Sequence, residues 1–244
     1  MKLISLNIEV NKHYDTVLPF LKREKADVVC IQELLESDFA LFKKELNLEG
    51  VFRAFTYVNY KYPDKINGQK HGVAIFANNI IDSGYVFYFG KEDNLLRSFT
   101  EHLADEDLRK NSVLIWADIK DNDGKVFKFV NTHLPVTKEG ESTLYQLQVV
   151  DALLKTLSSI PEFVICGDMN APRGNESFRR LAKKYKDNIP LKYETSIDQK
   201  LHRVKGIMFM VDGIFTTDAY VASNVKLIDG VSDHMAIVAD INKR

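Results

Sequence analysis

The chain alternates short apolar runs of β character with segments of helical periodicity. Two runs rich in β-branched residues, Lys2–Ile8 and Ala26–Glu33, have the length and composition of strands buried on both faces. The run between Pro161 and Gly167 has the same character. Apolar side chains recur at helical spacing in four further segments, which are Asp15–Lys25, Ser37–Leu46, Glu139–Leu157 and Ser177–Tyr185. The pattern therefore predicts a protein of mixed α and β structure.

Several more strand-like runs follow one another without helices between them. The pair Ser112–Ile119 and Val126–Val130 flanks a turn-forming Asp-Asn-Asp-Gly and predicts a hairpin. The other predicted strands are Val51–Tyr60, Gly72–Ala77, Ile81–Phe89, Met208–Phe215, Tyr220–Leu227 and Met235–Ile241. No repeat, low-complexity segment or flexible linker interrupts the pattern, so we expect a single domain over residues 1–244, with a mixed sheet split in two and helices outside.

The longest predicted helix, Glu139–Leu157, has the clearest apolar stripe. Its predicted members are Leu144, Leu147, Val150, Leu154 and Leu157. We expect this stripe to pack on a sheet.

Composition and charge narrow the class of protein. The 33 basic and 34 acidic side chains nearly balance, so any attraction to nucleic acid has to come from a local patch. The start of the sequence does not resemble a secretory signal and no stretch has membrane-spanning length, so we expect a cytoplasmic protein. Cys30 and Cys166 lie inside apolar runs, which predicts reduced core residues rather than a disulfide or metal site.

Polar side chains stand at the ends of most of the predicted core strands. Asp168 and Asn170 follow the central apolar run directly, where a rigid strand would hold them. The alternative is that such residues only form turns, for which Asp and Asn have local hydrogen-bonding reasons. A functional site is favoured because many strand ends carry a polar side chain of this kind. The ends of the other predicted strands contribute Asn7, Glu33, His133, Asp212, Asp233 and His234.

These side chains indicate a particular chemistry. Carboxylate and amide oxygens suit a hard cation such as Mg²⁺ or Mn²⁺, and the closely spaced Cys and His clusters typical of zinc or copper are missing from the sequence. Mg²⁺ is typically held by one or two carboxylates together with the oxygens of a phosphorylated substrate. The sequence therefore predicts metal-assisted phosphoester chemistry.

The order of these motifs resembles that of the endonuclease/exonuclease/phosphatase superfamily, which includes DNase I and exonuclease III. The resemblance spans essentially the whole chain and rests on Asn7, Gln32-Glu33, Asn131-Thr132-His133-Leu134, Gly167-Asp168-Met169-Asn170, Val211-Asp212-Gly213-Ile214-Phe215 and Ser232-Asp233-His234. It implies an α/β fold, a four-layer sandwich of two mixed β-sheets packed face to face with helices on the outside, and a site at one end of the sandwich.

The resemblance also implies roles for the residues. Glu33, assisted by Asn7 and Asp233, would bind the metal. Asp168 would orient or deprotonate the attacking water and Asn170 would fix the phosphate. His133 and His234 would donate to the charged transition state, and Asp212 would accept from the His234 ring.

The substrate is predicted less sharply. The exonuclease III branch has a tyrosine where this chain has His133, so the resemblance favours the DNase I branch over apurinic-site repair. Nucleic acid is the preferred substrate, and the candidate contacts are Tyr60, Lys61, Lys65, Lys70, His71 and Arg173. A surface position at the end of a loop is the alternative for His71. The near-neutral charge favours a second hypothesis, hydrolysis of small-molecule or lipid-headgroup phosphoesters, and a third is an inactive phosphate-binding module. We expect a monomer.

Overall fold

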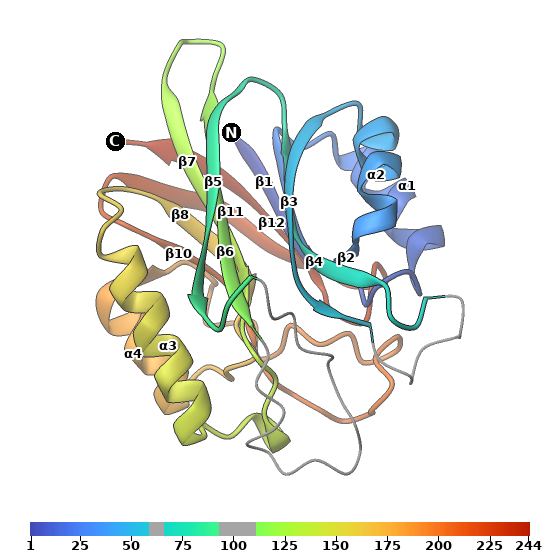
Figure 1. Cartoon of the computed structure of the whole chain (residues 1–244), viewed down its shortest axis with the longest axis vertical. Coiled ribbons are helices and arrows are strands. Elements are labelled where there is room, and N and C mark those ends of the chain that lie inside the picture. The colour runs from blue at the N-terminus through green and yellow to red at the C-terminus, as the bar shows by residue number, and fades with distance from the viewer. Residues whose placement is uncertain (59–65, 93–110) are drawn as a thin grey trace.

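The computed structural model describes residues 1–58, 66–92 and 111–244. In this part of the chain the strands form two six-stranded sheets packed face to face (Figure 1). The order in the first sheet is β11 (Tyr220–Ile228), β12 (Ala236–Lys243), β1 (Lys2–Asn7), β2 (Val28–Leu35), β4 (Lys70–Ala77) and β3 (Glu49–Tyr57). The order in the second sheet is β5 (Ile80–Phe89), β6 (Ser112–Lys120), β7 (Val126–His133), β8 (Val164–Asp168), β10 (Asp212–Thr216) and β9 (Lys186–Asp187).

Both sheets are mixed, and helices cover their outer faces. β1 pairs parallel with β2 and antiparallel with β12, while β7 pairs parallel with β8 and β8 antiparallel with β10. Helices α1 (Tyr14–Glu24) and α2 (Phe39–Leu46) lie on the first sheet, and α3 (Leu144–Leu157) and α4 (Glu176–Lys184) on the second (Figure 1). Two short 3₁₀ turns, η1 (Glu36–Asp38) and η3 (Lys138–Gly140), precede α2 and α3. The predicted four-layer α/β sandwich is confirmed.

Apolar packing fills the space between the layers. One cluster lies between the two sheets and includes Cys30 and Cys166, both buried and unbonded to each other as predicted. Two further clusters join each sheet to its own helices. In the described ranges, none of the helices combines the length and the apolar character needed to cross a membrane.

The predicted helix Glu139–Leu157 is shorter than its periodicity indicates. It begins only at Leu144, because Thr143 adopts an extended N-cap conformation and its side chain accepts from the backbone N–H of Gln146 at 3.2 Å. Leu144 is 74% exposed, so its place in the predicted stripe was wrong. The face that packs on the sheet consists of Gln146, Val149, Val150, Leu153 and Leu157.

The predicted strand Met208–Phe215 also starts late, at Asp212. The preceding residues are held by the segment around Ser196 instead of by the sheet. The Ser196 hydroxyl accepts from the backbone N–H groups of Val211 and Asp212, each at 3.1 Å. This attachment brings a long loop beside the start of β10. Of the predicted strand Val51–Tyr60, the structure confirms β3 as far as Tyr57.

A buried amide joins the two sheets through their apolar interface. Asn131 of β7 donates from Nδ2 to the carbonyl oxygens of Ile31 in β2 and Ala74 in β4, both at 2.9 Å. Its Oδ1 accepts from Gln32 Nε2 at 2.7 Å. Both amide side chains are fully buried. Since apolar contacts carry no direction, these hydrogen bonds fix how one sheet is placed on the other.

Replacing Asn131 should therefore be costly. Asn131→Ala leaves the Gln32 amide and at least one buried carbonyl without a partner, which should lower the free energy of unfolding by about 2–4 kcal/mol. Urea unfolding at neutral pH measures the change. Asn122→Ala, in the exposed hairpin turn, is the matched control and should change stability by less than about 0.5 kcal/mol. Equal stability of the two variants would rule out a structural role for the bridge.

Candidate active site

Three predicted residues form a row across neighbouring strands of the second sheet. His133 at the end of β7 is in register with Asp168 at the end of β8, and Asp168 is in register with Asp212 at the start of β10. Gly167 permits the close approach of β7 and β8, because its φ is +146° and a Cβ there would lie 2.0 Å from the carbonyl oxygen of Thr132. Sheet register thus assembles half of the site.

Glu33 comes from the first sheet, but not from a strand end as predicted. β2 continues to Leu35, and Glu33 occupies a β-bulge between Gln32 and Leu34 with a left-handed φ of 63°. A bulge of this kind redirects the side chain away from the alternation of the strand. Glu33 Oε1 consequently lies 3.9 Å from His133 Nε2 of the opposite sheet.

Asn7 bridges the carboxylates. Its Nδ2 lies 3.3 Å from Glu33 Oε1 and 3.1 Å from Asp168 Oδ2. Its Oδ1 accepts from the backbone N–H of Glu9 at 3.1 Å. Asn7 was predicted to assist in metal binding, which stays a prediction; in the structure its nitrogen orients Glu33 and Asp168 while its oxygen faces the backbone of Glu9.

His133 is held from three sides. Asn170, which takes a left-handed conformation with φ 45°, places its Nδ2 2.9 Å from His133 Nε2 and 2.8 Å from the carbonyl oxygen of Leu134. Asp168 Oδ2 lies 3.5 Å from the same ring nitrogen. The Phe55 ring stands edge-on to the imidazole at 5.4 Å between ring centres. The backbone N–H of Asn170 also donates to Asp168 Oδ1 at 2.8 Å, which closes the group.

His234 makes the contact with Asp212 that the sequence predicts. Its Nδ1 lies 2.7 Å from Asp212 Oδ2, and its Nε2 lies 3.8 Å from Asp168 Oδ2. Burial alone lowers the pKa of His234, but the two carboxylates outweigh it and hold that pKa well above its usual value. Burial raises the pKa of Asp168 to about 7, opposed by His234 and reinforced by Asp212. Asp168 therefore changes its charge near neutral pH, while His234 is held in its cationic form.

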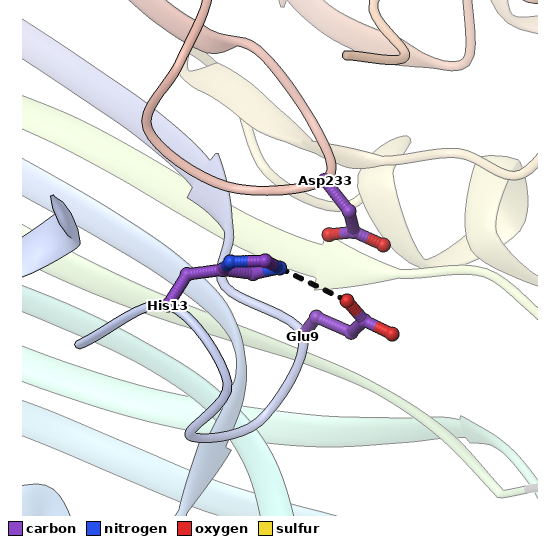
Figure 2. Close-up of side chains that lie close together, drawn as sticks. All are labelled: Glu9, His13 and Asp233. Carbon is purple, nitrogen blue, oxygen red and sulfur yellow. Dashed lines mark hydrogen bonds and ion pairs between the residues drawn. The ribbon is translucent and has the colours of Figure 1, made fainter. Parts of the chain in front are cut away.

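Asp233 precedes His234 but belongs to a different cluster. Its carboxylate lies with that of Glu9 and the ring of His13, where one ligand atom of each residue lies within 4.8 Å of the others (Figure 2). The prediction placed Asp233 with Glu33 on one metal, and this assignment stays a prediction. Sequence reasoning did not single out Glu9 or His13.

The residues predicted to contact the substrate lie in different environments. Tyr60, Lys61 and Lys65 lie outside the described residues. Lys70 is 41% exposed and lies 3.8 Å from Glu36, so it can reach a ligand. His71 is buried in β4, with its ring 5.3 Å from that of Phe55, so the surface position considered for it was wrong.

Arg173 was predicted to contact the substrate, but it precedes α4 and its guanidinium bonds within the protein. Its guanidinium donates to Asp187 Oδ2 at 2.9 and 3.1 Å and to the carbonyl oxygens of Ile189 and Tyr193. These hydrogen bonds fasten β9 and the segment that follows it to the loop beyond Asp168. We expect Arg173 to support the loop, since its donors are already occupied.

A basic loop beside the site was missed. Asp198 anchors it, because the Asp198 backbone N–H donates to the carbonyl oxygen of Asp233 at 2.8 Å and its carboxylate accepts from the N–H of Gly230 at 2.6 Å. Ile197 also forms a β-bridge with His234. The exposed basic residues that follow are Lys200, Arg203 and Lys205. The close spacing of these cations in the sequence could have indicated the loop, but only the fold shows that the start of the loop, at Ile197 and Asp198, is bonded to Asp233 and His234.

The arrangement can support metal-assisted hydrolysis. Glu33 and Asp168 offer hard carboxylate oxygens within one group, which fits a divalent cation better than a soft one. The imidazoles supply donors on the same side. A polar cavity of about 1070 Å³ lies elsewhere, lined by residues such as Met1, Asp27 and Lys120 at the opposite ends of the strands, and it contains none of these groups.

Comparisons with known proteins agree with this fold. A model of the Endonuclease/Exonuclease/phosphatase family matches residues 4–234, and no curated protein matches the sequence. The solved structure of the human Nocturnin catalytic domain with bound sulfate is similar at TM-score 0.74 and 17% identity, covering 100% of this chain and 93% of that one. A mannosyl-6-phosphatase of Bacteroides thetaiotaomicron is similar at TM-score 0.71 and 13% identity, covering 99% of both chains. TDP2 of D. rerio, complexed with a single-strand DNA product, is similar at TM-score 0.70 and 15% identity, covering 100% and 99%.

The raised pKa of Asp168 predicts a pH dependence of stability. A free aspartate titrates near 3.8, so between about pH 4 and about pH 7 the native protein keeps a proton that the unfolded chain has released. The contribution of this group to stability therefore falls as the pH rises through that window. Asp168→Asn removes the titration, so in EDTA its stability relative to wild type should improve from pH 4 to pH 8, by about 1.4 kcal/mol per unit of pKa difference.

Denaturant unfolding of both proteins at the two pH values measures this change. Asp218→Asn, at an exposed carboxylate, is the control and should follow the wild-type pH dependence closely. A constant difference between Asp168→Asn and wild type across the window would contradict the raised pKa.

Proposed function

Because the chain belongs to the endonuclease/exonuclease/phosphatase family, we propose that it is a divalent-metal-dependent phosphodiesterase that cleaves nucleic acid by in-line attack of water. Members of this family hydrolyse phosphoesters and generally use divalent metals. The observation that carries the proposal is the meeting of Asp168, Glu33 and the Asp212–His234 pair at one end of the sandwich.

Glu33 would hold the metal, with Asn7 keeping its carboxylate in place. When bound there, Mg²⁺ or Mn²⁺ would polarise a non-bridging phosphate oxygen and stabilise the leaving oxyanion. The donor set supports this assignment, because carboxylate oxygens are the usual protein ligands of Mg²⁺.

Asp168 is the group suited to orient and deprotonate water. A base works best when its pKa lies near the working pH, and burial brings the pKa of Asp168 to about 7. His234, kept cationic by Asp212, would donate to a phosphate oxygen as negative charge develops. His133 accepts from the Asn170 amide in this arrangement, so it would donate to the phosphate only once Asn170 turns to the phosphate instead.

Two observations support nucleic acid as the substrate. The exposed side chains of Lys200, Arg203 and Lys205 follow Asp198, which is bonded to the loop that carries His234. Lys70 adds a further exposed cation. Among structures of similar fold, TDP2 is complexed with a single-strand DNA product. Closely spaced cations beside a hydrolytic site are suited to a polyanionic backbone.

A small phosphoester is the second candidate. The near balance of 33 basic and 34 acidic residues supplies no long-range attraction for a polyanion. A mannosyl-6-phosphatase has a similar fold. A panel of single- and double-stranded DNA, RNA, nucleotides, sugar phosphates and phosphoinositides, each with Mg²⁺ or Mn²⁺, distinguishes the two.

The proposed mechanism predicts that hydrolysis depends on a divalent metal. Hydrolysis of bis(p-nitrophenyl) phosphate should stop in EDTA and return with Mg²⁺ or Mn²⁺. Glu33→Gln should weaken the metal dependence, measured as the metal concentration for half-maximal rate, without a large change in melting temperature. Asp168→Asn and His234→Ala should each lower kcat by about 10²–10⁴-fold with little effect on KM, since both act on the transition state.

Full activity in EDTA would refute the metal-assisted mechanism. A normal kcat in Asp168→Asn or His234→Ala would remove that residue from it. If none of the phosphoesters in the panel is hydrolysed but phosphate analogues still bind, the inactive binding module becomes the better description.

The second prediction concerns the substrate. Replacing Lys200, Arg203 and Lys205 by alanine should raise KM for single-stranded oligonucleotides and leave hydrolysis of bis(p-nitrophenyl) phosphate unchanged. The slope of log affinity against log salt should flatten by about 0.7 for each phosphate that the variant no longer neutralises. The matched control replaces Lys155, Lys183 and Lys184, which lie in the last turns of α3 and α4 near the opposite strand ends.

An unchanged salt slope in the loop variant would assign these cations to the solvated surface. A wild-type preference for a small phosphoester over all oligonucleotides would favour the second candidate.

A further inference from the structure

The buried side chain of Gln146 in α3 contacts both loops that leave β7 and β8 at the site. Its Nε2 donates to the carbonyl oxygen of Asn170 at 2.8 Å and to that of Pro135 at 3.2 Å. Its Oε1 accepts from the Ser177 hydroxyl at 2.7 Å. Pro135 lies two residues after the end of β7, and Asn170 lies two residues after the end of β8. One amide therefore joins the two loops.

The needs of helix α3 do not account for this side chain. Thr143 and Gln146 have the Thr-x-x-Gln spacing of a capping box, in which the glutamine side chain accepts from the backbone N–H of the N-cap residue. In this helix the Thr143 N–H donates to the carbonyl oxygen of Glu141 at 3.1 Å instead. The Thr143 hydroxyl still caps the helix by accepting from the Gln146 backbone N–H. The Gln146 amide is therefore used between segments and not within its own helix.

Burial makes the contacts of this amide obligatory. Gln146 is 0% exposed and lies on the same helix face as Val149 and Val150. An amide removed from water is costly unless its hydrogen bonds are made, and here the nitrogen has two partners and the oxygen one. Because the Ser177 hydroxyl donates to Oε1, it fixes the direction of the amide and keeps Nε2 turned toward the two loops.

The bond to Asn170 holds a backbone in an unfavourable conformation. Asn170 has a left-handed φ of 45°. Its N–H donates to Asp168 Oδ1 at 2.8 Å and its carbonyl oxygen accepts from Gln146, so both of its backbone polar groups are bonded. Its side-chain Nδ2 bonds separately, to His133 Nε2 and to the carbonyl oxygen of Leu134. The side chain can therefore turn toward a phosphate while the backbone stays in place.

We propose that Gln146 is a positioning residue, which holds the loops of His133 and Asn170 in the arrangement that hydrolysis requires. This inference rests on the proposed function. The Asn170 side chain has to pass from His133 to the phosphate, so the spacing of the two loops must stay constant while that side chain moves. An amide bonded to both loops provides this constraint. Its loss should impair the transition state more than the binding of substrate.

Amide hydrogen exchange on the ¹⁵N-labelled full chain tests the constraint without any substrate. Gln146→Met keeps an unbranched side chain of similar size but removes both donors. The Asn170 amide should exchange about tenfold faster or more in this variant, because its loop loses a buried hydrogen bond. Amides in the middle of β8 should change only as far as the global stability changes.

Hydrolysis of bis(p-nitrophenyl) phosphate with Mg²⁺ or Mn²⁺ tests the consequence for catalysis. Gln146→Met should lower kcat by about 10–100-fold and change KM by less than about threefold, since a misplacement of about 1 Å can cost this much. If Gln146→Met does not fold, Gln146→Asn keeps the amide but shortens it by one methylene. The same two changes are then expected at smaller size.

Two matched variants separate positioning from stability. Ser177→Ala removes the third hydrogen bond of the same amide and keeps both bonds to the loops. Val149→Ala leaves a cavity on the same buried face of α3. Both should keep kcat, and the exchange rate of Asn170 relative to β8, within about twofold of wild type. The Gln146→Met changes appearing in either control, or wild-type exchange at Asn170 in a folded Gln146 variant, would overturn the inference.

The two measurements also distinguish this inference from the proposed function. Faster exchange at Asn170 together with a wild-type kcat would overturn the positioning role. If the wild type hydrolyses no phosphoester, the proposed function fails, and the exchange rates alone decide whether Gln146 holds the two loops.

Discussion

The carboxamide of Asn131 makes the contacts on which the geometry of the site depends. The interface between the sheets is otherwise filled by apolar side chains, which resist separation but tolerate sliding. Asn131 bonds to the backbone of β2 and β4 and to Gln32, and so fixes both position and register. Glu33 is the next residue after Gln32, and His133 lies two residues after Asn131 on the same face of β7. The bridge therefore sets the distance between the halves of the proposed catalytic group.

Within that group, burial and the neighbouring charges shift the pKa values of the side chains in opposite directions. The proposed chemistry depends on this balance. Asp168 is enclosed by both sheets, so ionising it is costly, while His234 is kept cationic by the same carboxylates that burial penalises. The same arrangement therefore gives Asp168 a pKa near neutrality, as its proposed role as a base requires, and keeps His234 charged as a proposed hydrogen-bond donor. The lower stability that Asp168 causes at high pH is the cost of placing a carboxylate there.

The strand ends could be predicted because apolar runs and polar interruptions are local. They indicated a mixed sheet split in two with helices outside, and the four-layer sandwich was implied by the family that the six motifs resemble. Other features depend on contacts that no local pattern contains. Nothing in the alternation of apolar and polar residues along β2 shows that Glu33 forms a bulge with a left-handed φ. Likewise, the helical periodicity after Glu139 does not show that the helix begins only after Thr143. His71 was misplaced because a histidine beside a strand can face either way. Arg173 was misassigned because its partner Asp187 lies on another strand.

The cluster of Glu9, His13 and Asp233 shows the same limit most clearly, since Asp233 lies more than 200 residues after the other two in the sequence. Glu9 and His13 are spaced like a pair on one helical turn, which in isolation is an ordinary surface contact. The buried carboxylate of Asp233 joins Glu9 and His13 only because the loop before β12 folds back to the start of the first sheet. The Asn7 amide bonds on two sides. Its oxygen accepts from the backbone N–H of Glu9, and its nitrogen donates to Glu33 and Asp168. An amide cannot turn without exchanging both contacts, so the backbone N–H of Glu9 fixes the direction from which Asn7 holds the two carboxylates of the proposed site.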